Sequence, residues 1–143
     1  MKKRYFLILP LLTLLASCTY SGRLIINGTK KITNKEISAS YTKMEGTIGK
    51  TFKVKKDYEY NFILSVITFK DSEGGLYLKT FYNGEEKESR KISSDYFSKE
   101  EEESKENNYN FSITDEGKWD IRIIGENHKG SFTLTWEKVA LSN

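Results

Sequence analysis

The chain has 143 residues, 30% of them charged, and a formal net charge of +3 at pH 7. That excess comes from Lys2, Lys3 and Arg4, because the remainder of the chain holds 20 basic and 20 acidic residues. Nucleic acid is therefore not expected as a partner, since domains that bind it carry a clear basic excess. The single cysteine, Cys18, excludes an internal disulfide.

The amino terminus combines these three positive charges with an apolar run and the cysteine. The run, residues 5–15, is too short to cross a bilayer of roughly 30 Å as a helix, and Pro10 interrupts it. The residues Leu15-Ala16-Ser17-Cys18 resemble the lipobox of bacterial lipoproteins. The resemblance implies a cleaved signal peptide over residues 1–17 and a diacylglyceryl group on Cys18. An ordinary secretory signal followed by an unmodified thiol is the alternative.

A lipid on Cys18 predicts that the membrane is a partner and that the protein lies in the cell envelope, exposed outside the cytoplasm. One acyl chain gives only marginal membrane binding, whereas two chains hold a protein stably. In a cell with two membranes the resemblance implies the outer membrane, because Thr19 is not the aspartate that typically retains lipoproteins at the inner membrane.

Residues 18–36 are expected to form the lipidated N-terminus and a tether, because turn-forming residues such as Gly22 and Asn34 recur in them. Residues 24–26 are the apolar exception and predict a short edge strand. From Ile37 onward, apolar and polar residues alternate with the period of a strand. This pattern predicts one β-sandwich domain over residues 37–140.

The longest apolar run, residues 58–69, carries apolar side chains on both faces and predicts a central strand covered above and below. Turns are predicted at residues 71–75 and at Asn83-Gly84, a pair typical of hairpins. The other predicted strands are residues 37–41, 48–55, 76–82, 109–113, 119–123 and 132–136. The pattern favours an all-β fold, a single antiparallel β-sandwich of jelly-roll type with seven or eight strands.

Two segments depart from regular alternation. Residues 85–107 hold nine acids and five bases and predict a loop with one or two helical turns, for which Ser98 and Glu101 supply a cap. A cation or partner site and a solvated excursion both remain open for this segment. Residues 126–130 predict a loop that joins the strands of Trp119 and Trp136 into a hairpin.

The segments 111–125 and 130–137, with Gly117 at a turn and Trp119 and Trp136 in strands, resemble the closing strands of small bacterial jelly-roll domains. Pre-peptidase C-terminal domains of secreted proteases and small surface lipoproteins close in a similar way. The resemblance implies a β-sandwich that serves as a binding or accessory module. Its motifs are structural and imply no catalytic mechanism.

Residues that carry chemistry are few. His128 is expected to be a solvated residue of the 126–130 loop, and one histidine is too few for a zinc site. No catalytic residue, metal ligand or cofactor is therefore assigned. Four turn acids remain as candidates for a carboxylate hydrolase, and residues 71–75 faintly resemble a calcium loop. These acids are Asp71, Glu73, Asp115 and Glu116.

The leading hypothesis is a membrane-anchored, non-catalytic module of the cell envelope that binds a protein or a glycan. An inhibitor or immunity-type lipoprotein, with residues 85–107 or 126–130 as its contact loops, is the alternative, and a carboxylate-dependent hydrolase is the third. The binding residues stay unassigned, although aromatic side chains that could stack on sugars are plentiful. These are Tyr58, Tyr60, Tyr77, Tyr82, Trp119 and Trp136.

Overall fold

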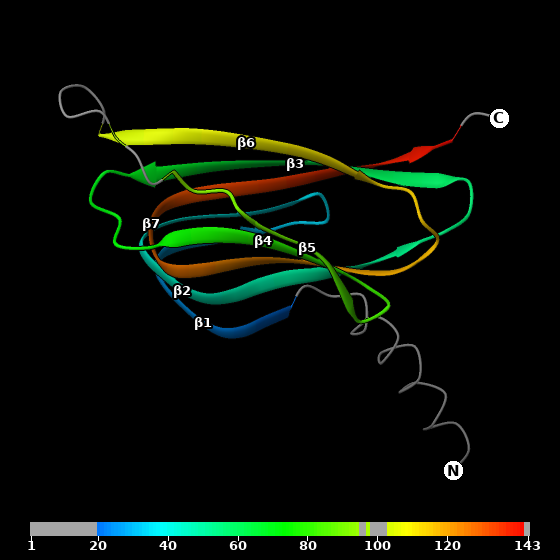
Figure 1. The fold of residues 1–143 in the computed structure, drawn as a ribbon, viewed down its shortest axis with the longest axis horizontal. Coiled ribbons are helices and arrows are strands. Elements are labelled where there is room, and N and C mark those ends of the chain that lie inside the picture. The colour runs from blue at the N-terminus through cyan, green and yellow to red at the C-terminus, as the bar shows by residue number, and fades with distance from the viewer. Residues whose placement is uncertain (1–19, 95–96, 98–102, 142–143) are drawn as a thin grey trace, which may run out of the picture.

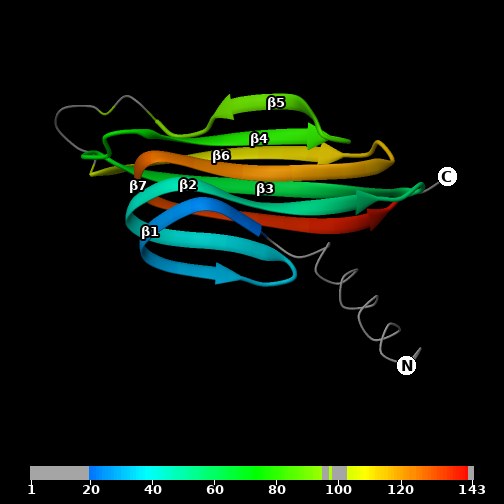
Figure 2. The same cartoon turned by 90° about the horizontal axis from the view of Figure 1, so that it is seen from below.

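The computed structural model describes residues 20–94, 97 and 103–141, so Cys18 and the predicted signal peptide lie outside the described residues. The described chain is all-β, with seven antiparallel strands in one continuous sheet that folds into two facing layers (Figure 1, Figure 2). The strands are β1 (Tyr20–Ile32), β2 (Glu36–Val54), β3 (Tyr58–Phe69), β4 (Gly75–Tyr82), β5 (Glu85–Lys91), β6 (Ser104–Ile113) and β7 (Gly117–Ala140). Within these ranges, no helix is long and apolar enough to span a membrane.

The two longest strands, β2 and β7, each run through both layers. In the layer that we call the β3 layer, the first part of β2 pairs with the last part of β7, and β3 and then β6 continue the sheet. In the β4 layer, the last part of β2 pairs with the first part of β7, and β4 and then β5 follow. β1 pairs with β2 along both parts. The result is a β-sandwich whose layers share the continuous strands β1, β2 and β7.

Irregular pairing marks the bend between the layers. The β2–β7 register shifts on both sides of Met44, and the β1–β2 register shifts between Asn27 and Gly28. On β7 the backbone at Asn127 has a φ of 52° and that at Gly130 a φ of 150°. Extra residues of this kind bend a strand and increase its twist. Because the irregularities on neighbouring strands lie side by side, the strands turn together without breaking the sheet.

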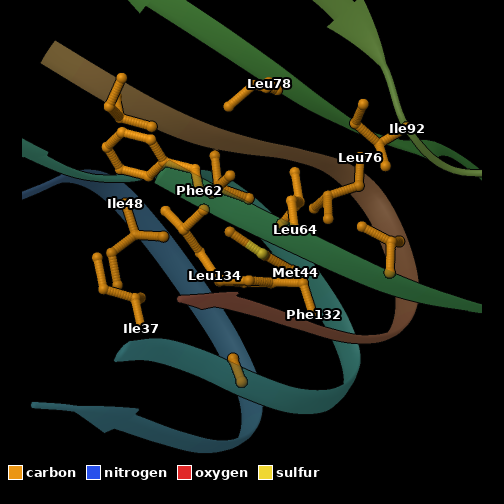
Figure 3. Close-up of a cluster of buried hydrophobic side chains, with 14 of the residues drawn as sticks. Ile37, Met44, Ile48, Phe62, Leu64, Leu76, Leu78, Ile92, Phe132 and Leu134 are labelled. Atoms are coloured by element: carbon orange, nitrogen blue, oxygen red, sulfur yellow. The ribbon is translucent and has the colours of Figure 1, made fainter. Parts of the chain in front are cut away.

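The core lies between the layers (Figure 3). Side chains of β3 and of the last part of β7, such as Leu64 and Leu134, are fully buried, as are Leu76 and Leu78 of β4 on the opposite layer. Each such side chain contributes on the order of 1.5–3 kcal/mol of hydrophobic free energy. The aromatic residues belong to this core too: the rings of Phe52 and Phe62 meet edge to face at 5.0 Å across the sandwich.

Several sequence predictions are confirmed. The fold class and the number of strands agree, and residues 70–74 form the predicted turn between β3 and β4. Asn83 and Gly84 connect β4 to β5 with φ angles of 49° and 86°, which are those of a tight hairpin turn. β3 is central in its layer, between β6 and β7. Its outer face is not covered as predicted, however, because Ile63 there is 51% exposed.

The structure differs from the prediction at both irregular segments. Residues 20–32 are strand β1 and not mainly a tether, because their backbone pairs with β2 along nearly their whole length. Residues 85–91 are edge strand β5 and not a loop, with six of its seven side chains exposed. Charged, solvated side chains are what an edge strand carries to avoid pairing with another chain. The predicted cap at Ser98 and Glu101 lies outside the described residues.

The predicted hairpin of Trp119 and Trp136 is wrong. Both residues lie on the single strand β7, and Trp119 pairs with Phe52 in the β4 layer whereas Trp136 pairs with Phe62 in the β3 layer. The segment 126–130 turns β7 back across the sandwich, so its two halves run in opposite directions in different layers and do not pair with each other (Figure 1). A polar segment ending in glycine is typical both of a hairpin loop and of a turn that carries a strand into the opposite layer. Here the neighbouring strand β2 bends at the same place, and this favours the turn between layers.

We predict that Gly130→Ala lowers the free energy of unfolding by about 3 kcal/mol. A Cβ at this position would overlap the main-chain carbonyl oxygen of Ile67, and φ there is 150°. Gly84→Ala is the matched control, because φ is also positive but nothing lies within 4 Å of its Cβ; a cost of about 1 kcal/mol is expected. Urea unfolding of the full-length protein measures both. Equal losses would contradict a close approach at the bend.

Candidate functional site

His128 lies in the interior of the bend and is fully buried. Its Nδ1 is 2.7 Å from the hydroxyl of Tyr41, and its Nε2 is 2.9 Å from the hydroxyl of Thr68. Either neutral tautomer of the ring satisfies both contacts, because a hydroxyl can donate or accept. The prediction that His128 is a solvated loop residue is therefore wrong. Strand β7 directs this side chain inward, where β2 and β3 supply hydrogen-bond partners for both ring nitrogens.

Burial controls the ionisation of this group. Desolvation lowers the pKa of His128 from 6.5 to about 4, and burial also raises the pKa of the Tyr41 hydroxyl. The imidazole is thus neutral at pH 7. A hydroxyl next to an imidazole is the pair that nucleophilic catalysis uses, but Thr68 and His128 are 1% and 0% exposed. No substrate reaches these side chains in this fold, so their role is to provide hydrogen-bond partners for each other at the bend.

The four turn acids do not gather. Asp71 bonds to the ammonium of Lys129 at 2.5 Å, and this hydrogen bond lowers the pKa of Asp71, opposite to what a general acid requires. In the same turn, the Ser72 hydroxyl accepts from the Lys129 amide and donates to the Gly74 carbonyl. These bonds tie the turn to the bend. In the described part of the chain, no three His, Cys, Asp or Glu side chains are grouped to hold a metal ion.

Asp115 and Glu116 also serve the fold, through their main chain. The Trp119 indole donates to the Asp115 carbonyl at 2.9 Å, and the Tyr82 hydroxyl donates to the Glu116 carbonyl at 2.5 Å. The rings of Tyr82 and Trp119 lie 4.8 Å apart. Both polar groups of this aromatic pair are therefore engaged in fixing the β6–β7 turn.

Tyr60, near the start of β3, and Trp136, near the end of β7, line the same hollow. These strand ends lie at the end of the sandwich opposite the bend (Figure 1). Each packs against the same buried ring, Phe52 of the other layer, with ring centroids 5.2 Å apart and steep interplanar angles. Phe52 is buried, whereas Tyr60 and Trp136 are only partly buried. The two layers thus hold a pair of aromatic side chains fixed and partly open to solvent.

Two adjoining hollows of about 600 and 380 Å³ open beside these rings and share Asn34, Tyr60, Trp136 and Lys138. We call them together the aromatic–lysine cleft. Its lining residues are Asn34, Lys35, Lys50, Thr51, Phe52, Lys53, Lys55, Tyr60, Trp136, Glu137 and Lys138. The Lys50 ammonium lies 5.7 Å from the Trp136 ring centroid and 5.8 Å from that of Phe52, within the range of a cation–π attraction.

This cleft combines an apolar aromatic surface with donors from lysine, asparagine and threonine. Such a combination is typical of a site that binds a small ligand or a segment of a polymer. Sequence reasoning included Tyr60 and Trp136 among the candidate aromatics but missed Phe52 and the lysines. The clustering of Lys50, Lys53 and Lys55 around Phe52 was the available signal; that Trp136 lies beside them follows only from the fold.

The other candidate contacts are dispersed. Tyr58 is 37% exposed and lies under the Lys138 ammonium at 4.4 Å, whereas Tyr77 is on the outer face of β4. The segment 126–130, a predicted contact loop, is the bend. On β5, Glu88 accepts from the Tyr109 hydroxyl of β6 at 2.7 Å and pairs with Arg90 at 2.8 Å. This contact fastens the two edge strands and gives part of the acidic segment a structural role.

No family model matches the chain, and no curated protein matches it. Among solved structures, a family 35 carbohydrate-binding module from Clostridium thermocellum aligns over 87% of this chain and 92% of its own, with 14% identity and a TM-score of 0.44. A mannan-recognising carbohydrate-binding module aligns over 87% and 89%, with 7% identity and a TM-score of 0.44. The pre-peptidase C-terminal domain of a Bacillus anthracis collagenase aligns over 85% and 89%, with 15% identity and a TM-score of 0.37. These are distant structural similarities that carry no conclusion about ligand or activity.

We predict a pH dependence of stability that arises from His128. Its pKa is about 4 in the fold against 6.5 for a histidine exposed to water, so its contribution is complete above pH 6.5 and is lost as the pH falls toward 4. Between pH 7 and pH 5 the protein should lose about 2 kcal/mol more than His128→Gln, which keeps a polar side chain but does not titrate. Urea unfolding at both pH values measures this, and equal losses would contradict it.

Proposed function

We propose that this protein is a membrane-anchored, non-catalytic module of the cell envelope that binds a glycan in the aromatic–lysine cleft. The observation that carries the proposal is the pair of partly buried rings, Tyr60 and Trp136, held against Phe52 beside the two hollows. A sugar ring has an apolar face of C–H groups and an edge of hydroxyls. Fixed aromatic rings can stack on the apolar face, and the surrounding polar side chains can form hydrogen bonds with the hydroxyls at the edge.

The rigidity of the rings supports binding over a purely structural role. Because Phe52 is buried and contacts both side chains, neither ring needs to lose conformational freedom when a ligand arrives. The exposed polar residues at the rim, including Asn34, Lys35 and Lys138, are not required by the core.

The membrane anchor in this proposal is the diacylglyceryl group on Cys18 that the lipobox predicts. Strand β1 begins at Tyr20 and pairs there with Gly49, the neighbour of the cleft residue Lys50. A lipid on Cys18 would hold the cleft close to the membrane surface. In that position the cleft could reach glycans of the envelope, and the protein would lie outside the cytoplasm.

We predict that Trp136→Leu weakens glycan binding at least about tenfold, a loss of about 1.4 kcal/mol of binding free energy. Trp119→Leu is the matched control, because Trp119 is also partly buried but packs against Tyr82 outside the cleft. Glycan binding by this variant should change less than about twofold. The full-length protein, purified in mild detergent, is screened on a glycan array, and the best ligand is titrated by calorimetry. Thermal unfolding of both variants controls for stability. No glycan binding by the unaltered protein would contradict the proposal.

The anchor has its own test. Cys18→Ala is expected to remove the protein from the membrane fraction or leave it uncleaved, since the lipid needs the thiol. Membrane fractionation, with mass spectrometry of the processed amino terminus, measures both. Normal processing and membrane association of this variant would overturn the lipobox assignment.

A further inference from the structure

We propose that the glycan bound in the aromatic–lysine cleft is anionic, an inference that rests on the function proposed above. Five of the lining residues are lysines, and Glu137 is the only acid among them. The chain beyond the three basic residues at its start holds equal numbers of basic and acidic residues. The excess of basic over acidic residues at the cleft therefore arises from the way the fold distributes charged residues, and not from the overall composition of the chain.

Four of these five lysines have no carboxylate partner within the described part of the chain. Lys35, Lys53, Lys55 and Lys138 lie within 4.0 Å of no carboxylate in the described part of the chain, whereas some lysines elsewhere are paired. Examples of the paired lysines are Lys31 with Glu36 at 3.8 Å, Lys79 with Glu86 at 3.6 Å and Lys129 with Asp71 at 2.5 Å. A hollow bordered by unpaired charges of one sign concentrates ligands of the opposite sign.

The position of the charge relative to the rings fits a charged sugar. The Lys50 ammonium is 5.7 Å from the Trp136 ring centroid. A sugar that stacks on this ring brings an acidic substituent within reach of that ammonium. The four other lysines come from the β1–β2 turn, from β2 and the residue after it, and from β7, so they surround the hollows.

The type of cation also bears on the ligand. No arginine is among the residues that line the cleft. The cleft lining therefore has no guanidinium group that could donate two parallel hydrogen bonds to one carboxylate or phosphate. Lysines act as separate point charges. Separate charges around an elongated hollow suit an acid repeated along a glycan chain better than a single anionic group. The shared chemistry is an acidic sugar chain, whether its acid is a carboxylate or a phosphate.

A membrane surface is the other anionic partner near this end of the molecule. A flat layer of headgroups would contact protruding side chains and leave the rings at the hollows without a partner. The aromatic pair therefore favours a glycan over lipid headgroups as the occupant.

The test compares two probes with the same sugar backbone, one charged and one neutral. Hexagalacturonate carries a carboxylate on each sugar, and its methyl ester has the same backbone without charge. Both are titrated by calorimetry into the full-length protein in mild detergent at low and high salt, alongside a glycan array that includes phosphate-bearing glycans. Binding to vesicles with and without anionic lipid is measured in parallel.

Two triple variants separate the cleft from general charge. The cleft variant is Lys35→Gln, Lys53→Gln and Lys55→Gln, and the control variant is Lys30→Gln, Lys43→Gln and Lys87→Gln. All six side chains are exposed, so both variants should fold, and both change the net charge equally. The cleft variant should weaken binding of acidic glycans about tenfold or more and the control variant less than about twofold, with weaker binding by the unaltered protein at high salt.

The outcomes distinguish the two proposals. Preference for acidic glycans, of either type, with loss in the cleft variant supports both. Equal affinity for hexagalacturonate and its ester, or array binding confined to neutral glycans, overturns the anionic ligand and leaves the glycan-binding function intact. Binding to anionic vesicles that depends on the cleft lysines, with no glycan bound, overturns both and makes the cleft a membrane contact.

Discussion

The bend shared by β2 and β7 is the constraint on which the rest of this structure depends. Both strands change layer there, so one sheet becomes a two-layered sandwich. The bend fixes which residues of the two layers meet. At the far end of the molecule, Phe52 of β2 lies opposite Tyr60, Phe62 and Trp136 because both strands turn at the same place. A change in the register of either strand would move these rings to the opposite face of their layer.

The bend is held by a polar cluster inside a mainly apolar interior. Tyr41, Thr68 and His128 come from three strands, and each ring nitrogen of His128 has a hydroxyl partner. A buried polar group without a partner costs about 1–3 kcal/mol, so the cluster favours one register of these strands over its alternatives. The same burial that keeps the imidazole neutral also closes it to substrates. In this protein the hydroxyl–imidazole pair stabilises the bend.

The end of the sandwich that holds the aromatic–lysine cleft is open to solvent, in contrast to the closed bend. Where the shared strands diverge from the bend, aromatic side chains reach the surface between the layers, and lysines from the β1–β2 turn, β2 and β7 surround them. The core thus continues into the cleft through Phe52, which is part of both. This continuity makes the rings rigid, and the rim supplies charge and hydrogen-bond donors that the core does not need.

The sequence by itself determined the all-β class and the two tight turns, because strand alternation and turn chemistry are local properties. It also determined the lipobox prediction at Cys18. It could not determine whether residues 126–130 return the chain within one layer or carry it into the other layer. That depends on β2, whose Tyr41 is 87 residues from His128 along the chain. Only the tertiary structure decided that His128 is buried and that Trp136 lies beside Lys50 and Phe52. These are contacts between distant segments, fixed by the common bend of two strands.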